Sequence, residues 1–208
     1  MIDVLGSNFM ASTSFTRTSS EKVHHLFKDP LLHELPKIAV FPGSFDPITN
    51  GHIDLIDRAC SLSLFDQLIV AIGINPGKEA RFSLEERVEM LKSVIQPYPI
   101  VSIAPYEGLT AQYAINCGAQ TIIRGLREFS DFEREFQMAR MNRQIAPEVD
   151  TLFMMSDLAH THISSTLAME VALMSNPRID KKRLIEMVPP VVVEFIQSKF
   201  YRVQDPNI

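Results

Sequence analysis

A short segment of the sequence gathers residue types that can bind and polarise a phosphate group. An apolar run ends at Gly43, Ser44 follows it, and Gly51 and His52 stand in the first turn of a predicted helix. The first turn of a helix carries unpaired N–H groups and the positive end of the helix dipole. A histidine at such a place can also be a simple cap or a surface residue. The spacing to Ser44 and Gly51 favours an anion site, in which His52 adds a hydrogen bond and need not be a base.

Cationic side chains follow two other apolar runs. Lys78 comes after the run at 67–73, and Arg124 and Arg127 come after the run at 120–123. Guanidinium groups bind oxyanions through two parallel hydrogen bonds, so the two arginines could face phosphates. Taken singly, Lys78 could equally be a solvated loop lysine, and either arginine could form a salt bridge at a helix end. The sequence leaves these alternatives open.

Three hydroxyl side chains, Ser164, Ser165 and Thr166, begin a further predicted helix. Hydroxyls beside unpaired helix amides can cap the helix, and they can also bind phosphate. The two roles can coexist, so this turn is a second candidate anion site.

The elements that must position these residues alternate between strand and helix. Short apolar runs rich in β-formers predict strands, and apolar side chains at helical spacing predict the helices between them. In the helix at 129–145, Phe129, Phe132, Phe136 and Ala139 are expected to form a core-facing stripe. The expected strands cover residues 37–41, 67–73, 100–103, 120–123 and 151–155. The expected helices cover 51–63, capped by Asn50, then 109–116, 129–145, 165–174 and 189–200, with another between the capping residue Ser83 and Pro97.

This alternation predicts an α/β fold: a Rossmann-like, doubly wound parallel sheet with C-terminal helices. Ligands of such sheets bind beyond the carboxyl ends of the strands, which is where the candidate residues fall.

Composition narrows the function classes. The chain has 208 residues and a net charge of -5, which argues against a nucleic-acid partner because backbone phosphates are bound by clustered Lys and Arg. No apolar run is long enough for a membrane span, and the N-terminus lacks a secretory apolar core, so a cytoplasmic protein is expected. Cys60 and Cys117 have no metal-ligand spacing and are expected to be ordinary buried thiols.

The order of several short segments resembles a known family. Gly43-Ser44-Phe45-Asp46-Pro47 followed by Asn50-Gly51-His52 is similar to the signature of nucleotidyltransferases. That element also occurs in class I aminoacyl-tRNA synthetases, but these need a second, lysine-rich signature that is missing here. Together with the later segments, it makes residues 37–200 similar to the phosphopantetheine adenylyltransferase family. Those segments are Arg124-Gly125-Leu126-Arg127, Asp131-Phe132-Glu133, Met141-Asn142-Arg143 and Ile163-Ser164-Ser165-Thr166.

The resemblance implies transfer of the adenylyl group of ATP to 4'-phosphopantetheine, which gives dephospho-coenzyme A and pyrophosphate by direct in-line attack. It also implies Mg²⁺ bound with ATP without a protein-built metal site, a homohexamer, and inhibition by coenzyme A. The expected organisation is an N-terminal extension at 1–36, poorly ordered or partly helical, a nucleotidyltransferase domain at 37–203 and a tail at 204–208. Two alternatives stay open: a nucleotidyltransferase for nicotinamide mononucleotide or a phosphorylated alcohol, and a catalytically silent module that binds nucleotide or senses coenzyme A.

The resemblance also implies roles for individual residues. His52, Lys78 and Arg124 would be catalytic, and Ser44, Lys78, Thr110 and Arg124 would bind the acceptor, with Leu109 beside its pantetheine arm. Ser44 replaces the usual threonine but keeps the hydroxyl. Met169 stands where the superfamily often has an arginine, so one cationic phosphate contact is missing. The residues implied to bind ATP are Ser44, Phe45, His52, Gly125, Leu126, Arg127, Glu135, His160, Thr161, His162, Ile163, Ser164, Ser165 and Thr166.

Overall fold

The computed structural model describes residues 35–77, 79–174 and 181–201. The chain divides into two units after Leu35, and the elements described below all belong to the second unit, Pro36–Ile208. Residues 1–34, Lys78 and the tail at 204–208 lie outside the described residues, so the boundaries expected for the extension and the tail stay predictions.

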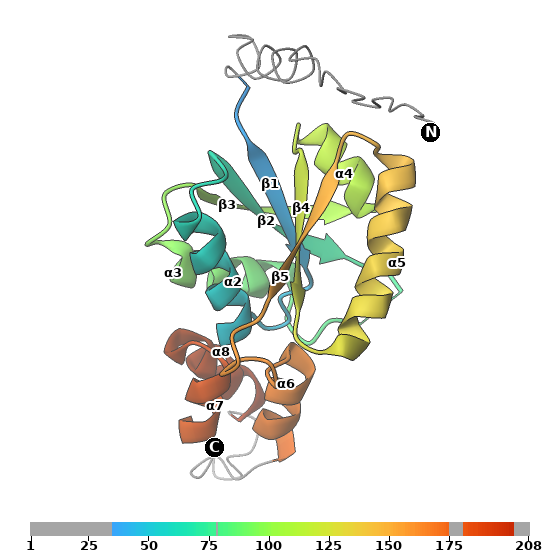
Figure 1. Ribbon diagram of the computed structural model, residues 1–208. Coiled ribbons are helices and arrows are strands. Elements are labelled where there is room, and N and C mark those ends of the chain that lie inside the picture. The colour runs from blue at the N-terminus through green and yellow to red at the C-terminus, as the bar shows by residue number, and fades with distance from the viewer. Residues whose placement is uncertain (1–34, 78, 175–180, 202–208) are drawn as a thin grey trace, which may run out of the picture. The chain divides into compact units, whose positions relative to one another are not determined.

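Five parallel strands form one sheet in the order β3-β2-β1-β4-β5 (Figure 1). The central strand, β1, pairs with β2 on one side and β4 on the other. Both faces of β1 are covered, because Ala39 and Val40 point to opposite faces and are both fully buried. The strands are β1 Ile38–Gly43, β2 Gln67–Ile74, β3 Val101–Glu107, β4 Thr121–Leu126 and β5 Asp150–Met155.

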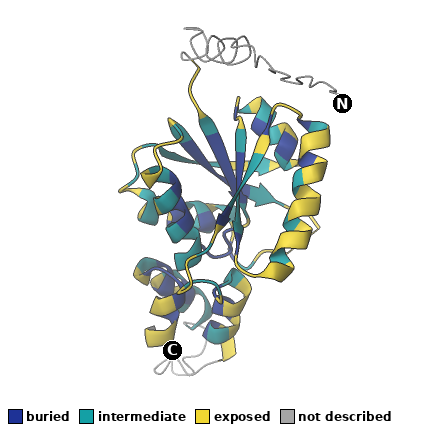
Figure 2. Ribbon diagram, viewed as in Figure 1, coloured by how far each residue is buried: buried dark blue, intermediate teal, exposed yellow. Residues whose placement is uncertain are grey.

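The helices cover both faces of the sheet, which confirms the doubly wound α/β fold. An apolar cluster on one face joins α2 and α3 to the sheet and continues into α6, α7 and α8. A second cluster on the other face contains the buried side of α4 and the residues that follow α5. Figure 2 shows these buried residues along the strands and the inner sides of the helices. The helices are α2 Asn50–Ser61, α3 Leu84–Ile95, α4 Thr110–Asn116, α5 Phe129–Ile145, α6 Ser165–Met174, α7 Lys181–Met187 and α8 Pro190–Phe200.

Most expected elements are present, and those at 129–145 and 165–174 have the expected bounds. The expected cap of α2 is wrong: Thr49 caps the helix, while the Asn50 side chain donates to the carbonyl oxygens of Ile185 and Glu186 in α7. α7 itself was not expected. Cys60 and Cys117 are only partly buried, although full burial was expected, and they form no disulfide.

The expected core stripe of α5 is also wrong. Phe129 is 91% exposed and Phe136 is 47% exposed, and Asn142 is the one buried residue of the helix. The rings stack on one another instead, with the centroids of Phe132 and Phe136 5.6 Å apart. The helix therefore presents an aromatic face that the rest of the described chain does not cover.

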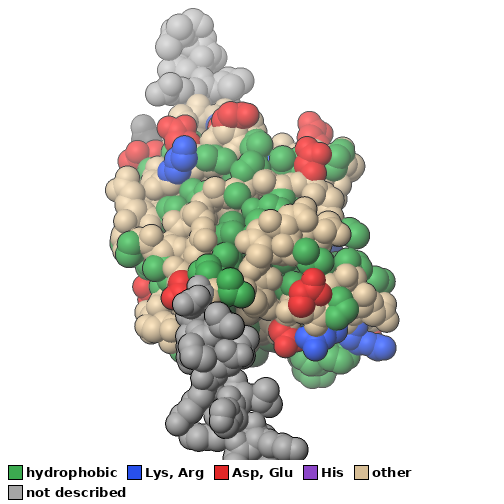
Figure 3. Space-filling view, turned by 90° about the horizontal axis from the view of Figure 1, so that it is seen from above, with side chains coloured by type: hydrophobic (Ala, Val, Ile, Leu, Met, Phe, Trp, Pro, Cys, Tyr) green, Lys and Arg blue, Asp and Glu red, His purple; other side chains and the backbone are tan. Residues whose placement is uncertain are grey.

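The charges on the described surface agree with the acidic composition. On the face seen in Figure 3, Lys and Arg side chains are few, and Asp and Glu side chains are scattered between apolar and uncharged ones. Among the described helices, none has both the length and the hydropathy that a membrane crossing requires.

Candidate active site

The candidate residues meet where the strand order reverses. β1 is followed in the chain by its neighbour β2, whereas its other neighbour, β4, comes later, so the switch point lies between β1 and β4. Ser44 directly follows β1, and Arg124 and Arg127 lie on and just after β4. The switch point of a parallel sheet is where a crevice opens beyond the strand ends.

The N-terminus of α2 holds His52 in a defined orientation. Thr49 caps the helix, and its backbone N–H donates to His52 Nδ1 over 3.0 Å. Thr49 Oγ1 lies 2.9 Å from the same nitrogen. The ring of Phe45 packs edge-on against the imidazole, with centroids 5.1 Å apart. The Phe45 side chain is 1% exposed, so it supports the histidine from inside and is not available as a surface contact.

The surroundings of His52 keep its ring uncharged near neutral pH. Burial is the largest cause that lowers its pKa, from 6.5 to about 4, and the positive charges of Arg127 and Arg124 act in the same direction. Desolvation and like charges both disfavour the imidazolium form. His52 therefore offers hydrogen bonds and not a positive charge.

Two buried polar side chains fix the loop that carries Ser44. The carboxylate of Asp46, 8% exposed, accepts hydrogen bonds from the backbone N–H groups of Arg81 and Phe82, each over 2.8 Å. Arg87, 6% exposed, donates to the Ser44 carbonyl oxygen over 2.9 Å. Ser44 is thus held on its backbone side while it stays exposed to solvent.

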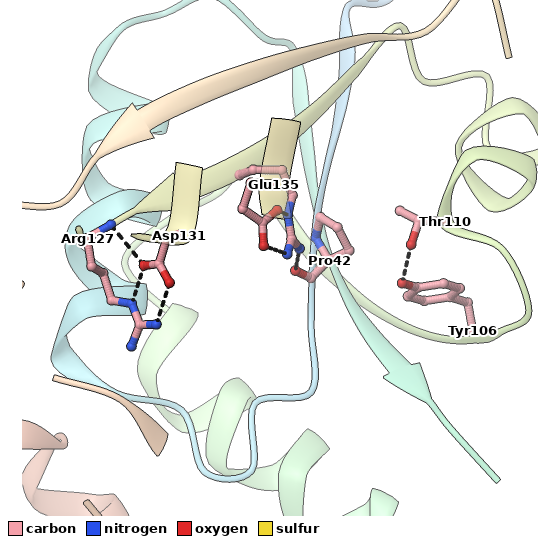
Figure 4. Close-up of polar contacts among 7 residues, drawn as sticks. Pro42, Tyr106, Thr110, Arg127, Asp131 and Glu135 are labelled. Carbon is pink, nitrogen blue, oxygen red and sulfur yellow. Dashed lines mark hydrogen bonds and ion pairs between the residues drawn. The ribbon is translucent and has the colours of Figure 1, made fainter. Parts of the chain in front are cut away.

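Arg124 projects from β4 into a double ion pair with α5. Its Nε and one terminal nitrogen donate to the two carboxylate oxygens of Glu135 over 2.6 and 2.8 Å, and the other terminal nitrogen donates to the Pro42 carbonyl over 2.9 Å. Figure 4 shows this arrangement beside Thr110, whose hydroxyl pairs with Tyr106 over 2.8 Å. A pocket of about 70 Å³ lies here, lined by Pro42, Thr110, Ile122, Arg124, Glu135, Met138, Ala139 and Asn142.

Arg127 makes the second ion pair. Its guanidinium donates to both carboxylate oxygens of Asp131, over 3.0 and 3.1 Å, and the Arg127 backbone N–H also donates to Asp131 (Figure 4). The salt-bridge alternative thus describes the geometry of both arginines. The side chains of Arg124 and Arg127 nevertheless remain 31% and 40% exposed, which leaves guanidinium surface for a ligand.

The hydroxyls at the start of α6 mainly serve the protein itself. Ser164 accepts from the Leu167 backbone N–H over 3.0 Å, and Ser165 donates to the Pro47 carbonyl over 2.7 Å. Ser165 therefore ties α6 to the loop after β1. Thr166 is exposed on the first turn and remains the hydroxyl most open to a ligand.

The segment before α6 is joined to α2. Arg58 donates to the Met155 carbonyl over 2.5 Å, and Asp54 accepts from the Asp157 backbone N–H over 3.4 Å. Asp54 and Arg58 also pair with each other, as their spacing predicts. Further along, Nδ1 of His160 is the one buried side-chain nitrogen or oxygen in the described ranges that lacks a hydrogen-bond partner. An unpaired buried nitrogen is costly, so a polar ligand group or a water is its natural complement.

Two expected features have another explanation in the structure. A Cβ on Gly125 would lie 2.4 Å from Leu55 Cδ1, so the Leu55 side chain would have to shift, and the glycine suits the close packing of α2 on β4. Met169 is fully buried, so that position contributes to the core and not to a phosphate contact. Lys78 lies outside the described residues, and its role stays a prediction.

Several site residues were missed from the sequence alone. Thr49 and His52 are three apart, the spacing of a capping box, but histidine is not the usual partner in that motif. Asp46 and Arg87 act through tertiary contacts that no local pattern reveals. Asn142 belongs to a segment that carries the family resemblance, but no role was assigned to it, although it is buried in the pocket wall.

The described residues do not build a metal site of their own. Within 35–77, 79–174 and 181–201, no three His, Cys, Asp or Glu side chains come together at metal-binding distance. The two carboxylates nearest the crevice, Glu135 and Asp131, are committed to arginines.

Comparisons with known proteins decide the family. The cytidylyltransferase-like family model matches residues 40–171. A phosphopantetheine adenylyltransferase from Desulforamulus reducens is 47% identical over 164 residues, which is 79% of this chain and 97% of that protein. The chain belongs to the phosphopantetheine adenylyltransferase family. A member of this family from Carboxydothermus hydrogenoformans is 53% identical over 66% of this chain and 83% of its own length.

Solved structures agree with the fold of this phosphopantetheine adenylyltransferase family member. A nicotinic acid mononucleotide adenylyltransferase from Plasmodium falciparum, complexed with NaAD, superposes with a TM-score of 0.59 at 16% identity, over 79% of this chain and 96% of that one. A putative nicotinate-nucleotide adenylyltransferase from Vibrio parahaemolyticus gives 0.56 at 17% identity, over 81% and 96%. At such identities the similarity establishes the shared fold alone.

Proposed function

We propose that this chain transfers the adenylyl group of ATP to 4'-phosphopantetheine, forming dephospho-coenzyme A and pyrophosphate in coenzyme A biosynthesis. One observation carries the proposal: 47% identity over 97% of the length of the Desulforamulus reducens phosphopantetheine adenylyltransferase. A crevice at the strand ends, flanked by a helix N-terminus and two arginines, is physically suited to two phosphate-bearing substrates.

The chemistry needs alignment and charge stabilisation. An oxygen of the acceptor phosphate forms a bond to the α-phosphorus of ATP, and the bond from that phosphorus to the bridging oxygen of the β-phosphate breaks, releasing pyrophosphate. No covalent enzyme intermediate is needed, because the substrates react directly once they are in line. His52 donates a hydrogen bond to an α-phosphate oxygen, where negative charge develops in the transition state. A comparable donor lowers the activation barrier by about 3 to 4 kcal/mol.

On the acceptor side, Arg124, Thr110 and Ser44 are the proposed contacts. The proposal is supported by the pocket that Thr110 and Arg124 share and by the clamp that leaves Ser44 exposed. Glu135 acts through Arg124, because its carboxylate aligns the guanidinium. Lys78 completes this set on the strength of the family resemblance alone.

On the nucleotide side, the proposed contacts come from Arg127 and the segment that leads into α6. The unpaired Nδ1 of His160 and the exposed Thr166 support this assignment. Arg127 also donates to the Ile163 carbonyl over 3.5 Å, which joins the two parts of the proposed nucleotide site. The remaining proposed ATP contacts are Ser44, Gly125, Leu126, Thr161, His162, Ile163, Ser164 and Ser165, together with the backbone of Phe45, whose side chain is buried.

Mg²⁺ is proposed as the companion of ATP. The described residues do not gather the oxygen ligands of a dedicated site, so the ion would be held by the nucleotide phosphates and water.

A panel of acceptors tests the proposed function. Purified protein is incubated with ATP and, in separate reactions, phosphopantetheine, nicotinamide mononucleotide and a phosphorylated alcohol, and the adenylylated product and pyrophosphate are quantified. Dephospho-coenzyme A from phosphopantetheine alone is the expected result. Turnover of another acceptor would identify that compound as the substrate. Nucleotide binding without turnover of any acceptor would identify the protein as a binding module.

Self-association into a homohexamer and inhibition by coenzyme A complete the proposal. The aromatic face of α5 supports self-association, because large exposed apolar patches mark protein interfaces. Its members are Phe129, Phe132 and Phe136, between 40% and 91% exposed. Light scattering on the full chain should give the mass of six subunits. Phe132→Ser should lower that mass, while the matched surface change Leu62→Ser should leave it unchanged.

Coenzyme A added to the assay should compete with phosphopantetheine. Unaltered rates would mean that coenzyme A does not inhibit this enzyme.

A further inference from the structure

We infer that Thr49 is a positioning residue that holds His52 as a neutral imidazole with its proton on Nε2. This inference deepens the proposed function, because it specifies the form in which His52 meets the transferring phosphate. His52 then donates through Nε2 and supplies no charge.

The direction of one hydrogen bond fixes the tautomer. The donor is the backbone N–H of Thr49, and the acceptor is His52 Nδ1, 3.0 Å away. A backbone N–H can only donate, so Nδ1 must present its lone pair. The single proton of the neutral ring therefore lies on Nε2.

With the ring in this tautomer, the Thr49 hydroxyl is the donor in its contact with Nδ1. Its Oγ1 lies 2.9 Å from Nδ1 and also accepts from the His52 backbone N–H over 3.4 Å, which closes the capping box. Thr49 is 2% exposed, so water does not replace these contacts readily. A protonated ring would carry N–H groups on both nitrogens, and the one on Nδ1 would face the N–H of Thr49. Charging His52 therefore requires the cap to open.

The groups around the ring act in the same direction. Phe41 and Phe45 enclose it, with centroids 6.3 and 5.1 Å from that of the imidazole. The charged groups facing it from β4 are Arg124 and Arg127, and both disfavour the imidazolium form. Their partner carboxylates, Glu135 and Asp131, come from α5. The titratable His160, before α6, lies against Gly51, the residue before His52. A Cβ added to Gly51 would lie 3.7 Å from His160 Cβ.

A division of labour follows. The arginines supply the positive charge that the reacting phosphates need, and His52 supplies a directed hydrogen bond. A donor that works as the neutral form loses nothing when the pH falls through the ordinary histidine range, whereas an imidazolium donor would gain activity there.

Nuclear magnetic resonance of the imidazole nitrogens tests the tautomer without reference to activity. In full-length protein labelled with ¹⁵N-histidine, His52 is assigned by comparison with His52→Gln. Its Nε2 should carry the proton at pH 7 and still at pH 5.5. A proton on Nδ1, or an imidazolium signal at pH 6, would overturn the inference. This readout judges the inference even if the acceptor panel refutes the proposed function.

Two variants of Thr49 test the positioning role. Thr49→Ser keeps the hydroxyl, and Thr49→Val keeps the shape but removes it. Thr49→Ser should retain the tautomer and the wild-type kcat, whereas Thr49→Val should lower kcat by about ten- to a hundredfold with little change in the KM for ATP. Thr49→Val should keep the proton on Nε2, because the backbone N–H that sets the tautomer remains. Wild-type kcat in a folded Thr49→Val protein would show that the side chain positions nothing. If Thr49→Val fails to fold, the inference is judged by the wild-type spectrum and by the kcat and tautomer of Thr49→Ser, both of which should equal those of the wild type.

Discussion

Acidification should destabilise the folded chain through His52. The pKa of this residue is lowered from 6.5 to about 4 in the folded protein, mainly by burial. Between these values the unfolded chain binds a proton that the folded chain refuses. The stability is therefore fully present above pH 6.5 and is lost as the pH falls toward 4. Each pH unit costs about 1.4 kcal/mol, so the loss attributable to His52 between pH 7 and pH 4.5 is about 2.4 kcal/mol.

Urea unfolding at the two pH values measures this loss. Carboxylates in ion pairs also lose stability in acid, so the relevant quantity is the difference between wild type and a variant without the titrating ring. His52→Gln is the matched variant, because glutamine three residues after Thr49 is a standard capping-box partner and should preserve the helix start. His162→Gln, an exposed histidine in the segment before α6, serves as the control and should behave as wild type.

The expected result is a free energy of unfolding that falls by about 2 kcal/mol more in wild type than in His52→Gln when the pH is lowered. Equal losses in the two proteins would mean that the folded chain protonates His52 as easily as the unfolded chain does. The enclosure of the ring by Phe45 and its contact with Thr49 would then not have the energetic effect assigned to them.

Three further outcomes are expected. His52→Ala should lower kcat by about a hundred- to a thousandfold while the dissociation constant for ATP, measured by calorimetry, changes little, and unchanged turnover would remove the residue from the chemistry. Arg87→Met should raise the KM for phosphopantetheine and lower kcat by about tenfold, because the Ser44 carbonyl loses its buried donor; steady-state kinetics equal to wild type would contradict that clamp. Gly125→Ala should lower the free energy of unfolding, measured in urea, by about 1 to 3 kcal/mol, because its Cβ overlaps Leu55. The double variant with Leu55→Ala should lose less stability than the sum of the two single variants, and strict additivity would count against that overlap.

The sheet and most of its helices could be predicted from the sequence for a simple reason. Strands covered on both faces must be apolar throughout, and β1 and β2 therefore appear as short apolar runs. The bounds of α5 and α6 also follow from local signals. Periodicity identified the apolar face of α5 correctly but could not tell what covers it, and the rest of the described chain does not.

The candidate site was only partly predictable. Its location followed from the rule that ligands bind beyond the strand ends, and the residue types followed from the chemistry of phosphates. The pairing of Arg124 with Glu135, and of Arg87 with the Ser44 carbonyl, depends on how distant segments pack. The cap of α2 was assigned to Asn50, which is a good capping residue, but Thr49 just before it is one as well. Thr49 is the cap because the imidazole of His52 accepts a hydrogen bond from the Thr49 backbone N–H and completes the capping box.

Helix α5 carries side chains that belong to two separate surfaces of the molecule. Glu135 lines the pocket and aligns Arg124, while its neighbour in the chain, Phe136, faces outward on the aromatic face. A rigid helix cannot shift one of these side chains without shifting the other. A molecule that moves the helix when it binds the outer face would therefore change the affinity of the pocket, and occupancy of the pocket would then change the outer contact by the same factor.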